Sequence, residues 1–481
     1  MGRDSSWWSA RAGARKVVGM LVSGDVARVM GDGLDRIREE CEVPTSFPPA
    51  VVEAAETAAH RPLGSEHRDR TGERFVTLDP ATSVDLDQAF AIEVAGDDIV
   101  LHYAIADVGW FVQPGDALDA EAFERGVTVY LPDERASLYP TVLSEGAASL
   151  LPDVDRPAVV FTVRVASDGI TRLDGVERAL IRNTAKLAYD AVTASDMPAG
   201  FDELHRRIEA AERARDAPRV EFPEQEIEHD PAGGYALRFR PRLESEEQNA
   251  ALSLATNLAV AGSLYAARTG LFRVMPDVDQ RDIRRLRNSA RAFGLDWPAD
   301  RSLADFERSL PRGDPRTSAF LIAVRRAAGG ASYAPYSADR HPWHSAVAAT
   351  YAQATAPLRR LQDRYVIEAA YAVANGRAVP DVVEQAFAAL PPAMARGEQR
   401  ANRAERMALD LAEAVVLSGR EGDIFDAVVI DESDRGVEVQ ISDPAILVRL
   451  TARRVDPGDD VRVRLVTADV ATRSVEFERV S

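Results

Sequence analysis

The spacing of hydrophobic and polar residues changes along the chain and divides it into segments. The first 60 residues carry a weak helical pattern, which is clearest over residues 30–41 and 49–60. Pro48 and Pro49 stand where the second of these helices is expected to begin, because proline fits the first turn. Residues 61–74 are polar throughout and are predicted to form a linker.

A β-rich region follows this linker, and a long helical region follows the β-rich one. Short runs of β-branched and aromatic residues predict strands over residues 75–78, 99–105, 127–131 and 159–163. From Glu244 to about Gly419 the apolar residues recur at helical spacing. Loops with proline or glycine are expected to interrupt this helical region at 275–280, 310–316 and 329–343.

The last part of the chain returns to alternating and β-branched runs. Strands are predicted over residues 425–430, 436–441, 461–466 and 474–478, with a turn at residues 456–459. Several short strands in such a short stretch fit a small OB-type β-barrel. The pattern therefore predicts an α+β protein with a helical lead and linker (1–70), a central domain (71–420) and a C-terminal barrel (421–481).

The charge of the chain is uneven. Its 481 residues contain 58 basic and 77 acidic residues, for a net charge of −19. That total argues against a general nucleic-acid binder, whose binding face is usually basic. Residues 71–250, however, carry 17 basic and 35 acidic residues, whereas residues 251–420 carry 23 and 17. A split of this kind is a reason to look for a polyanion or metal site.

Composition excludes several other classes of protein. Cys41 is the only cysteine, which rules out an intrachain disulfide and a cysteine-based zinc site. No run of about 18 apolar residues is present, so no membrane span is expected. The N-terminus also lacks the apolar core of a signal peptide. We therefore expect a cytoplasmic protein. Only two of its basic residues are lysines, so any phosphate contact would be made mainly by arginine, which forks onto phosphate oxygens.

The most informative stretch is acidic. Asp79, Asp85 and Asp87 lie within nine residues, directly after a predicted strand, and Pro80 and Ser83 indicate a loop between them. Clustered carboxylates repel one another unless a cation lies between them. Hard oxygen ligands of this kind suit Mg²⁺ or Mn²⁺. A solvated acidic turn or a weak calcium loop would give the same pattern.

A basic stretch lies far away in the sequence. Residues 355–364 are predicted to open a helix at Pro357, which would place Arg359 and Arg360 in its first turn. That end of a helix already favours an anion, and two cations there suggest an anionic partner. The alternative is a solvated pair of arginines, with Asp363 as the partner of Arg359. A second basic run, residues 281–291, is predicted to form an amphipathic helix with a solvated face.

Taken together, these motifs resemble the catalytic domain of the ribonuclease II / ribonuclease R (RNB domain) family, in particular its short actinobacterial-type members. The family's Asp-x5-Asp-x-Asp-Asp motif is matched by Asp79, Asp85 and Asp87. Further matching stretches follow in family order, at residues 104–108, 130–133, 143–150, 186–190, 355–360 and 403–406. The resemblance covers about residues 75–420.

The resemblance implies a mixed sheet surrounded by helices that form a channel, followed by an OB-type barrel. It also implies a magnesium-dependent exoribonuclease, with manganese possible, that hydrolyses single-stranded RNA from the 3′ end to nucleoside 5′-monophosphates. No obligate protein partner is evident.

The implied roles fall on particular residues of this sequence. Asp79, Asp85, Asp87 and Gln88 would be the metal residues, with Asp85 and Asp87 also catalytic. Arg359 would grip the scissile phosphate. The RNA-binding set would be Tyr130, Tyr189, Arg359, Arg360 and Glu405. From the residues alone, the two tyrosines could equally belong to the core, and Glu405 could pair with an arginine on its own helix.

Two departures from the family pattern leave other functions open. Gln88 stands where the family usually has a fourth aspartate, so the site loses one negative charge. The C-terminal segment has a net charge of −6 and only two aromatic residues, Phe425 and Phe477, although such barrels usually stack bases on aromatic rings. The alternatives are a catalytically weakened or inactive RNA-binding protein and a structural partner in an RNA-decay or ribosome assembly.

Overall fold

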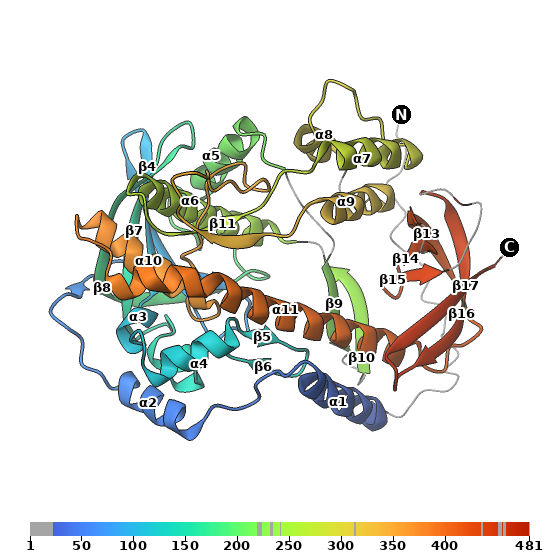
Figure 1. Cartoon of the computed structure of the whole chain (residues 1–481), viewed down its shortest axis with the longest axis horizontal. Helices are drawn as coiled ribbons and strands as arrows, with labels where there is room; N and C mark the ends of the chain where they lie inside the picture. Colours follow the sequence, from blue (N-terminus) through green and yellow to red (C-terminus); the bar gives the residue numbers. More distant parts are fainter. Residues whose placement is uncertain are drawn as a thin grey trace.

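In a computed structural model, the described residues are 23–218, 224–230, 234–240, 242–311, 314–433, 436–450, 455 and 458–480. The fold is mixed α+β, with a large sheet at one end of the molecule and a small barrel at the other (Figure 1). Helix α11 (Asp381–Leu417) runs from the helices around the sheet to the barrel. No helix in the described parts of the chain is long and apolar enough to span a bilayer.

The large sheet has six strands in the order β1-β8-β2-β3-β4-β7. Their bounds are β1 (Arg68–Asp69), β2 (Phe75–Asp79), β3 (Gln88–Ala95), β4 (Asp98–Ala106), β7 (Asp155–Val165) and β8 (Thr171–Ala188). Strand β8 runs parallel to β1 and β2 but antiparallel to β7. Because β7 pairs with both β4 and β8, the sheet returns on itself through β8.

Helices cover this sheet and enclose its core. They are α2 (Pro49–Ala59), α3 (Val108–Phe111), α4 (Ala117–Arg125), α5 (Phe201–Ala214), α6 (Glu244–Ala266) and α10 (Leu361–Ala374), with a π-helix at Leu143–Ala147. Strand β4 is buried along most of its length, and α6 carries buried side chains along its whole length. A strand that is buried on both faces has a nearly continuous run of apolar residues. This run is why β4 could be predicted from the sequence.

Three further helices and three two-stranded antiparallel sheets lie before α11 in the described part of the chain. The helices are α7 (Gln280–Ala292), α8 (Leu303–Ser309) and α9 (Pro315–Ala327). The two-stranded sheets are the hairpins β5–β6 (Val129–Tyr130 and Arg135–Ala136) and β9–β10 (Glu224–Asp230 and Gly234–Arg240), and the strand pair β11–β12 (Leu271–Val274 and Ser332–Pro335), between whose strands α7, α8 and α9 lie in the sequence. Helices α7, α8 and α9 share a small apolar cluster with Ile430 of the barrel.

The C-terminal barrel is an antiparallel sheet in the order β15-β14-β13-β16-β17. Its strands are β13 (Ile424–Ser433), β14 (Gly436–Ile441), β15 (Ile446–Leu450), β16 (Asp460–Asp469) and β17 (Ser474–Val480). The outer strands β15 and β17 contact each other, so the sheet is nearly closed. Its interior is continuous with apolar residues of α11 and of α1 (Ser23–Glu40), including Leu34 and Leu411. The barrel and both helices therefore fold around one core.

The α+β fold and the barrel-like C-terminal sheet confirm the fold class predicted from the sequence. Strands β3, β8 and β15, the hairpin β9–β10 and the strand pair β11–β12 were not predicted. The segment 61–74 is mostly irregular but contributes the short strand β1, and the strand expected at 127–131 is shortened to β5. Two residues of the turn expected at 456–459 lie outside the described residues.

Candidate active site

The acidic motif forms a loop between β2 and β3 that is fixed at several points. The amine of Lys186 donates hydrogen bonds to the backbone oxygens of Ala81 (2.7 Å) and Ser83. The hydroxyl of Ser149 donates to the backbone oxygen of Val84 at 2.7 Å and accepts from the backbone nitrogen of Leu86 at 2.9 Å. These contacts hold the loop, and so set the directions in which its three aspartates point.

Asp87 is buried, with 5% of its surface exposed. Its Oδ1 accepts a hydrogen bond from the backbone nitrogen of Leu358 at 2.7 Å, and its Oδ2 lies 3.3 Å from Nε of Arg359. Burial raises the pKa of Asp87 to about 7, although the positive charge of Arg359 and the bond from Leu358 oppose the rise. The acidic loop and the distant basic stretch thus meet at one carboxylate.

Asp79 is the last residue of β2, and like Asp87 it feels the charges of Arg359 and Asp85. Its Oδ2 is buried and has no hydrogen-bond partner among the described residues. Burial raises its pKa to about 6, with repulsion from Asp85 adding to the rise and attraction from Arg359 and Lys186 opposing it. A buried carboxylate oxygen without a partner is costly, so this atom is a candidate ligand position.

Asp85 points to the hairpin β5–β6. Its Oδ1 lies 2.6 Å from Nη1 of Arg135, and its Oδ2 accepts a long hydrogen bond of 3.4 Å from the hydroxyl of Tyr130. Arg135 also contacts Glu145 at 2.7 Å. Two of the three motif carboxylates are therefore each neutralised by an arginine.

Gln88 opens β3, and its side chain faces α6. Its Oε1 accepts hydrogen bonds from the hydroxyl of Tyr103 and, at 3.1 Å, from the hydroxyl of Ser253. The two hydroxyls are also 2.8 Å apart, so the three side chains form a closed group. Both lone-pair directions of the amide oxygen are used. This arrangement favours a structural role for Gln88 over the ligand role expected from the resemblance.

The position of Arg359 and Arg360 differs from the sequence prediction. Helix α10 begins at Leu361, so neither arginine lies in its first turn. Residue 360 is extended (φ −135°, ψ 119°) and forms an antiparallel bridge with Val127. Extended backbone turns successive side chains to opposite sides.

The two arginines consequently have different environments. The side chain of Arg359 is 46% exposed and reaches Asp87. The side chain of Arg360 turns inward and pairs with the fully buried Asp363 at 2.6 Å. Asp363 is therefore the partner of Arg360, not of Arg359 as the alternative reading had it. Arg360 is not available to RNA in this structure.

Both tyrosines expected to stack on bases lie near the carboxylates. Tyr130 is 48% exposed, as an unstacked ring in an RNA site would be. The backbone nitrogen of Tyr189 donates to the backbone oxygen of Asp79 at 3.2 Å, and its hydroxyl accepts a hydrogen bond from Asn249 at 2.8 Å. Burial raises the pKa of Tyr189 to about 12. Glu405, in contrast, is exposed on α11, and no contact between it and the other candidate residues is found in the described part of the chain.

Several residues of the site were not predicted from the sequence. Arg135, Tyr103, Ser253 and Asn249 each touch a motif residue or a tyrosine of the site. Ser253 and Asn249 lie in the middle of α6, where nothing in the local sequence distinguishes them. Arg135 could have been found from its place in the chain, because it follows Tyr130 by five residues and the short hairpin β5–β6 pairs the two.

The donors fit a hard divalent cation. They are carboxylate oxygens, and one of them, Oδ2 of Asp79, is buried without a partner. No group of three His, Cys, Asp or Glu side chains within the described ranges is arranged to hold a metal ion. The ligand set is therefore only partly assembled, since arginines engage Asp85 and Asp87.

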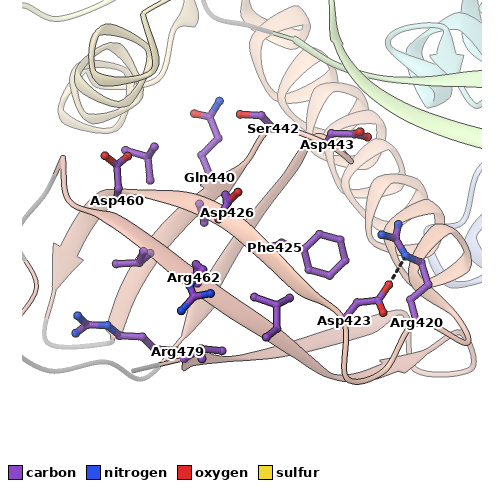
Figure 2. A pocket seen from close by; sticks show the side chains of 15 residues that line it. Arg420, Asp423, Phe425, Asp426, Gln440, Ser442, Asp443, Asp460, Arg462 and Arg479 are labelled. Atoms are coloured by element: carbon purple, nitrogen blue, oxygen red, sulfur yellow. Dashed lines mark hydrogen bonds and ion pairs between the residues drawn. The ribbon is translucent and has the colours of Figure 1, made fainter. Parts of the chain in front are cut away.

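A separate hollow of about 960 Å³ lies on the barrel, away from these carboxylates (Figure 2). Its lining mixes acidic and basic side chains, which are Asp423, Asp426, Asp443, Asp460, Arg420, Arg462 and Arg479. Phe425 lies beside them, but most of its ring is buried against Phe477. The hollow therefore offers neither a basic track nor an exposed aromatic platform, which are the features of a single-strand binding groove.

Comparisons with known proteins agree with this geometry. Residues 67–375 match the family model described as RNB domain, and residues 423–480 match that of the RNase II-type exonuclease C-terminal S1 domain. Ribonuclease R of Aquifex aeolicus is 26% identical over 95% of this chain and 72% of its own length. The chain covers 64% of the length of ribonuclease R of Thermotoga maritima, at 25% identity, and 62% of that of ribonuclease R 1 of Lactococcus lactis, at 22% identity.

Two solved structures are similar in fold. One is Mycoplasma genitalium RNase R in complex with ribose-methylated single-stranded RNA, with a TM-score of 0.82 and 19% identity over 94% of this chain and 78% of that chain. The other is yeast Ssd1, a pseudonuclease, with a TM-score of 0.68 and 15% identity over 91% of this chain and 58% of that chain. The RNB match spans well over half of the chain and includes every residue of the carboxylate–arginine site, and on this basis the chain belongs to the RNB-domain family of ribonucleases.

Proposed function

We propose that this chain is a divalent-metal-dependent hydrolytic exoribonuclease, with Mg²⁺ as the cation and Mn²⁺ as a possible substitute. It would degrade single-stranded RNA from the 3′ end and release nucleoside 5′-monophosphates. The single observation that carries the proposal is the contact of Asp87 with Arg359, whose charge also acts on Asp79, a buried carboxylate with one oxygen that has no partner among the described residues. This contact places a carboxylate that can bind a cation next to a guanidinium that can bind a phosphate.

Each group of the site has a chemical task in this proposal. Asp79, Asp85 and Asp87 would hold the cation, which when bound activates water and stabilises the leaving oxygen. The half-exposed Arg359 can leave Asp87 for a phosphate oxygen, because the contact at 3.3 Å is a single, partly solvated one. Tyr130, exposed beside Asp85, offers a ring face to a base.

Relatives named ribonuclease R and exoribonuclease 2 support this activity. The polarity, the products and the single-stranded substrate are inferred from that kinship together with the sequence motifs. We propose three domains, 1–70, 71–420 and 421–481, in which α11 joins the second to the third, because its first part packs in the core of the large sheet and its last part in the core of the barrel. We also propose a cytoplasmic location, since RNA decay needs no other compartment.

The proposal is tested with purified full-length protein and 5′-labelled single-stranded RNA, in Mg²⁺ and in chelator. A ladder of shortening products that ends in a short oligomer, seen only with Mg²⁺, is the expected result. An RNA blocked at its 3′ end should resist degradation. The matched control variant is Asp155→Asn, which changes an exposed carboxylate of β7 that is paired with Arg182 and lies outside the acidic loop. Metal-independent cleavage, or internal cuts in the blocked RNA, would contradict the proposal.

A second candidate function is RNA binding without turnover. Two observations favour it: Gln88 is committed to Tyr103 and Ser253, and arginines engage both Asp85 and Asp87. The similarity in fold to a pseudonuclease shows that this fold accommodates such a protein. Binding of the labelled RNA without any shortening, at all Mg²⁺ and Mn²⁺ concentrations tried, would favour this function over the first.

A further inference from the structure

The hairpin β5–β6 directs two side chains at one carboxylate. Tyr130 and Arg135 are opposite each other in its antiparallel register. Opposite residues lie on the same face of a strand pair. Both reach Asp85, with Nη1 of Arg135 at 2.6 Å from Oδ1 and the Tyr130 hydroxyl at 3.4 Å from Oδ2. The hairpin thus fixes Asp85 from one side.

Arg135 has a second carboxylate partner. Its Nη2 lies 2.7 Å from Oε1 of Glu145, which belongs to the π-helix Leu143–Ala147. Single-turn π-helices are frequent at functional sites. The side chains of Arg135, Asp85 and Glu145 are 23%, 14% and 29% exposed, so all three are partly shielded from water. Two carboxylates share one guanidinium, which leaves the group with a net charge of −1.

The hairpin itself is anchored from outside the site. Arg38 of α1, only 6% exposed, pairs with Asp133 and Glu134 at the hairpin turn. Because the turn is held, the backbone of Arg135 is fixed, and its guanidinium bridges Asp85 through Nη1 and Glu145 through Nη2. This differs from Arg359, whose exposed side chain makes a single contact with Asp87.

We infer that Arg135 is a positioning residue that holds Asp85 in the metal-free protein, and that it releases Asp85 and keeps Glu145 as its partner when a divalent cation binds at Asp85. The inference rests on the proposed function, because it takes Asp85 to be a ligand. A dication at Asp85 is repelled by a guanidinium in contact with the same carboxylate. Glu145 makes the release of Asp85 possible, because a guanidinium that is partly shielded from water and has no anionic partner would destabilise the protein.

The two partners of Arg135 therefore have opposite effects on cation binding. Arg135→Gln removes the competitor, so the cation should bind Asp85 more tightly. Glu145→Gln removes the alternative partner, so Arg135 stays on Asp85 and the cation should bind more weakly. A group whose only role is to stabilise the fold would instead weaken binding in both variants.

The experiment measures Mn²⁺ binding to the RNA-free, full-length protein by isothermal titration calorimetry. We expect the Kd to fall on the order of tenfold in Arg135→Gln and to rise by a similar factor in Glu145→Gln. Arg135→Lys keeps the charge and should give a Kd near that of the unaltered protein. Arg182→Gln, which removes an exposed ion pair with Asp155, is the matched control, and circular dichroism verifies that each variant is folded.

Shifts in the same direction in the two variants, or no shift in either, would overturn the inference. If the unaltered protein shortens RNA with Mg²⁺ but the Kd values of the two variants shift in the same direction or not at all, the inference alone fails and the proposed function stands. If the unaltered protein neither binds Mn²⁺ nor shortens RNA, both fail. RNA shortening is therefore measured in parallel on the same preparations.

Discussion

Asp87 and Arg359 are 272 positions apart in the sequence, yet Nε of Arg359 lies 3.3 Å from Oδ2 of Asp87. The contact joins the acidic segment 71–250 to the basic segment 251–420. The global charge of −19 therefore says little about this site, because opposite charges from the two segments meet there. The environments of these and neighbouring residues lead to five predictions.

Replacing Asp87 with asparagine should abolish RNA shortening and keep most of the RNA affinity. The amide can still accept the backbone hydrogen bond from Leu358 but loses the negative charge that a cation needs. Turnover is measured with labelled RNA and affinity by fluorescence anisotropy in chelator. Near-normal turnover would exclude a metal role for Asp87.

Replacing Arg359 with alanine should reduce kcat/KM by an amount equivalent to about 2–4 kcal/mol of transition-state stabilisation, the usual loss for one such electrostatic contact. The half-exposed side chain makes few packing contacts, so the unfolding midpoint should change little. Arg182→Ala serves as the control for loss of an exposed arginine. A decrease of less than about tenfold in rate would identify Arg359 as a surface residue.

Replacing Arg360 with alanine should act mainly on stability. Its removal leaves the carboxylate of Asp363 buried without its ion pair, a change that costs about 3–5 kcal/mol in other proteins. Urea denaturation measures the loss. A variant of normal stability with impaired RNA binding would instead restore the RNA-contacting role expected from the sequence.

The part of the stability that depends on Asp79 and Asp87 should decrease in the metal-free protein as the pH rises from about 4 to about 7. Burial raises the pKa values of Asp79 to about 6 and of Asp87 to about 7, above those of the unfolded chain. Between these limits the folded state binds more protons than the unfolded state, so the free energy of unfolding falls with rising pH. Asp87→Asn removes one titrating group and should flatten the curve.

This pH dependence is measured by urea denaturation in chelator, with the two proteins compared at each pH. Because a cation needs ionised ligands, Mg²⁺ should restore more stability at the upper end of the range than at the lower end. Parallel curves for the two proteins would contradict the raised pKa of Asp87.

Replacing Gln88 with alanine should lower the free energy of unfolding by about 1–3 kcal/mol, because the buried hydroxyl of Tyr103 loses an acceptor. The Kd for Mn²⁺ should change by less than about threefold, since the amide oxygen is engaged by Tyr103 and Ser253. Gln113→Ala, which removes an exposed glutamine, is the control. A much larger loss of Mn²⁺ affinity would show that Gln88 is a ligand.

The sequence predicted those elements whose burial is visible in their residue types. Strand β4 is apolar on both faces, and α7 has a regular helical spacing. Strand β8 was missed because it contains many charged residues. In the fold, these find partners on neighbouring elements, as with Asp174 and Arg164, Arg182 and Asp155. Local sequence carries no record of such partners.

For the site, the sequence named candidate residues but not the contacts between them. Residue types and loop position made the three aspartates and the arginine pair candidates, whereas the two tyrosines were named from the family resemblance. Only the tertiary structure decided which members act together. The bridge of residue 360 with Val127 extends the backbone and turns Arg359 toward Asp87 and Arg360 into the core. The tertiary structure also places Arg135 against Asp85 and hydrogen-bonds Gln88 to Ser253 of α6. Such choices depend on contacts between segments far apart in the chain, which residue types and spacing do not encode.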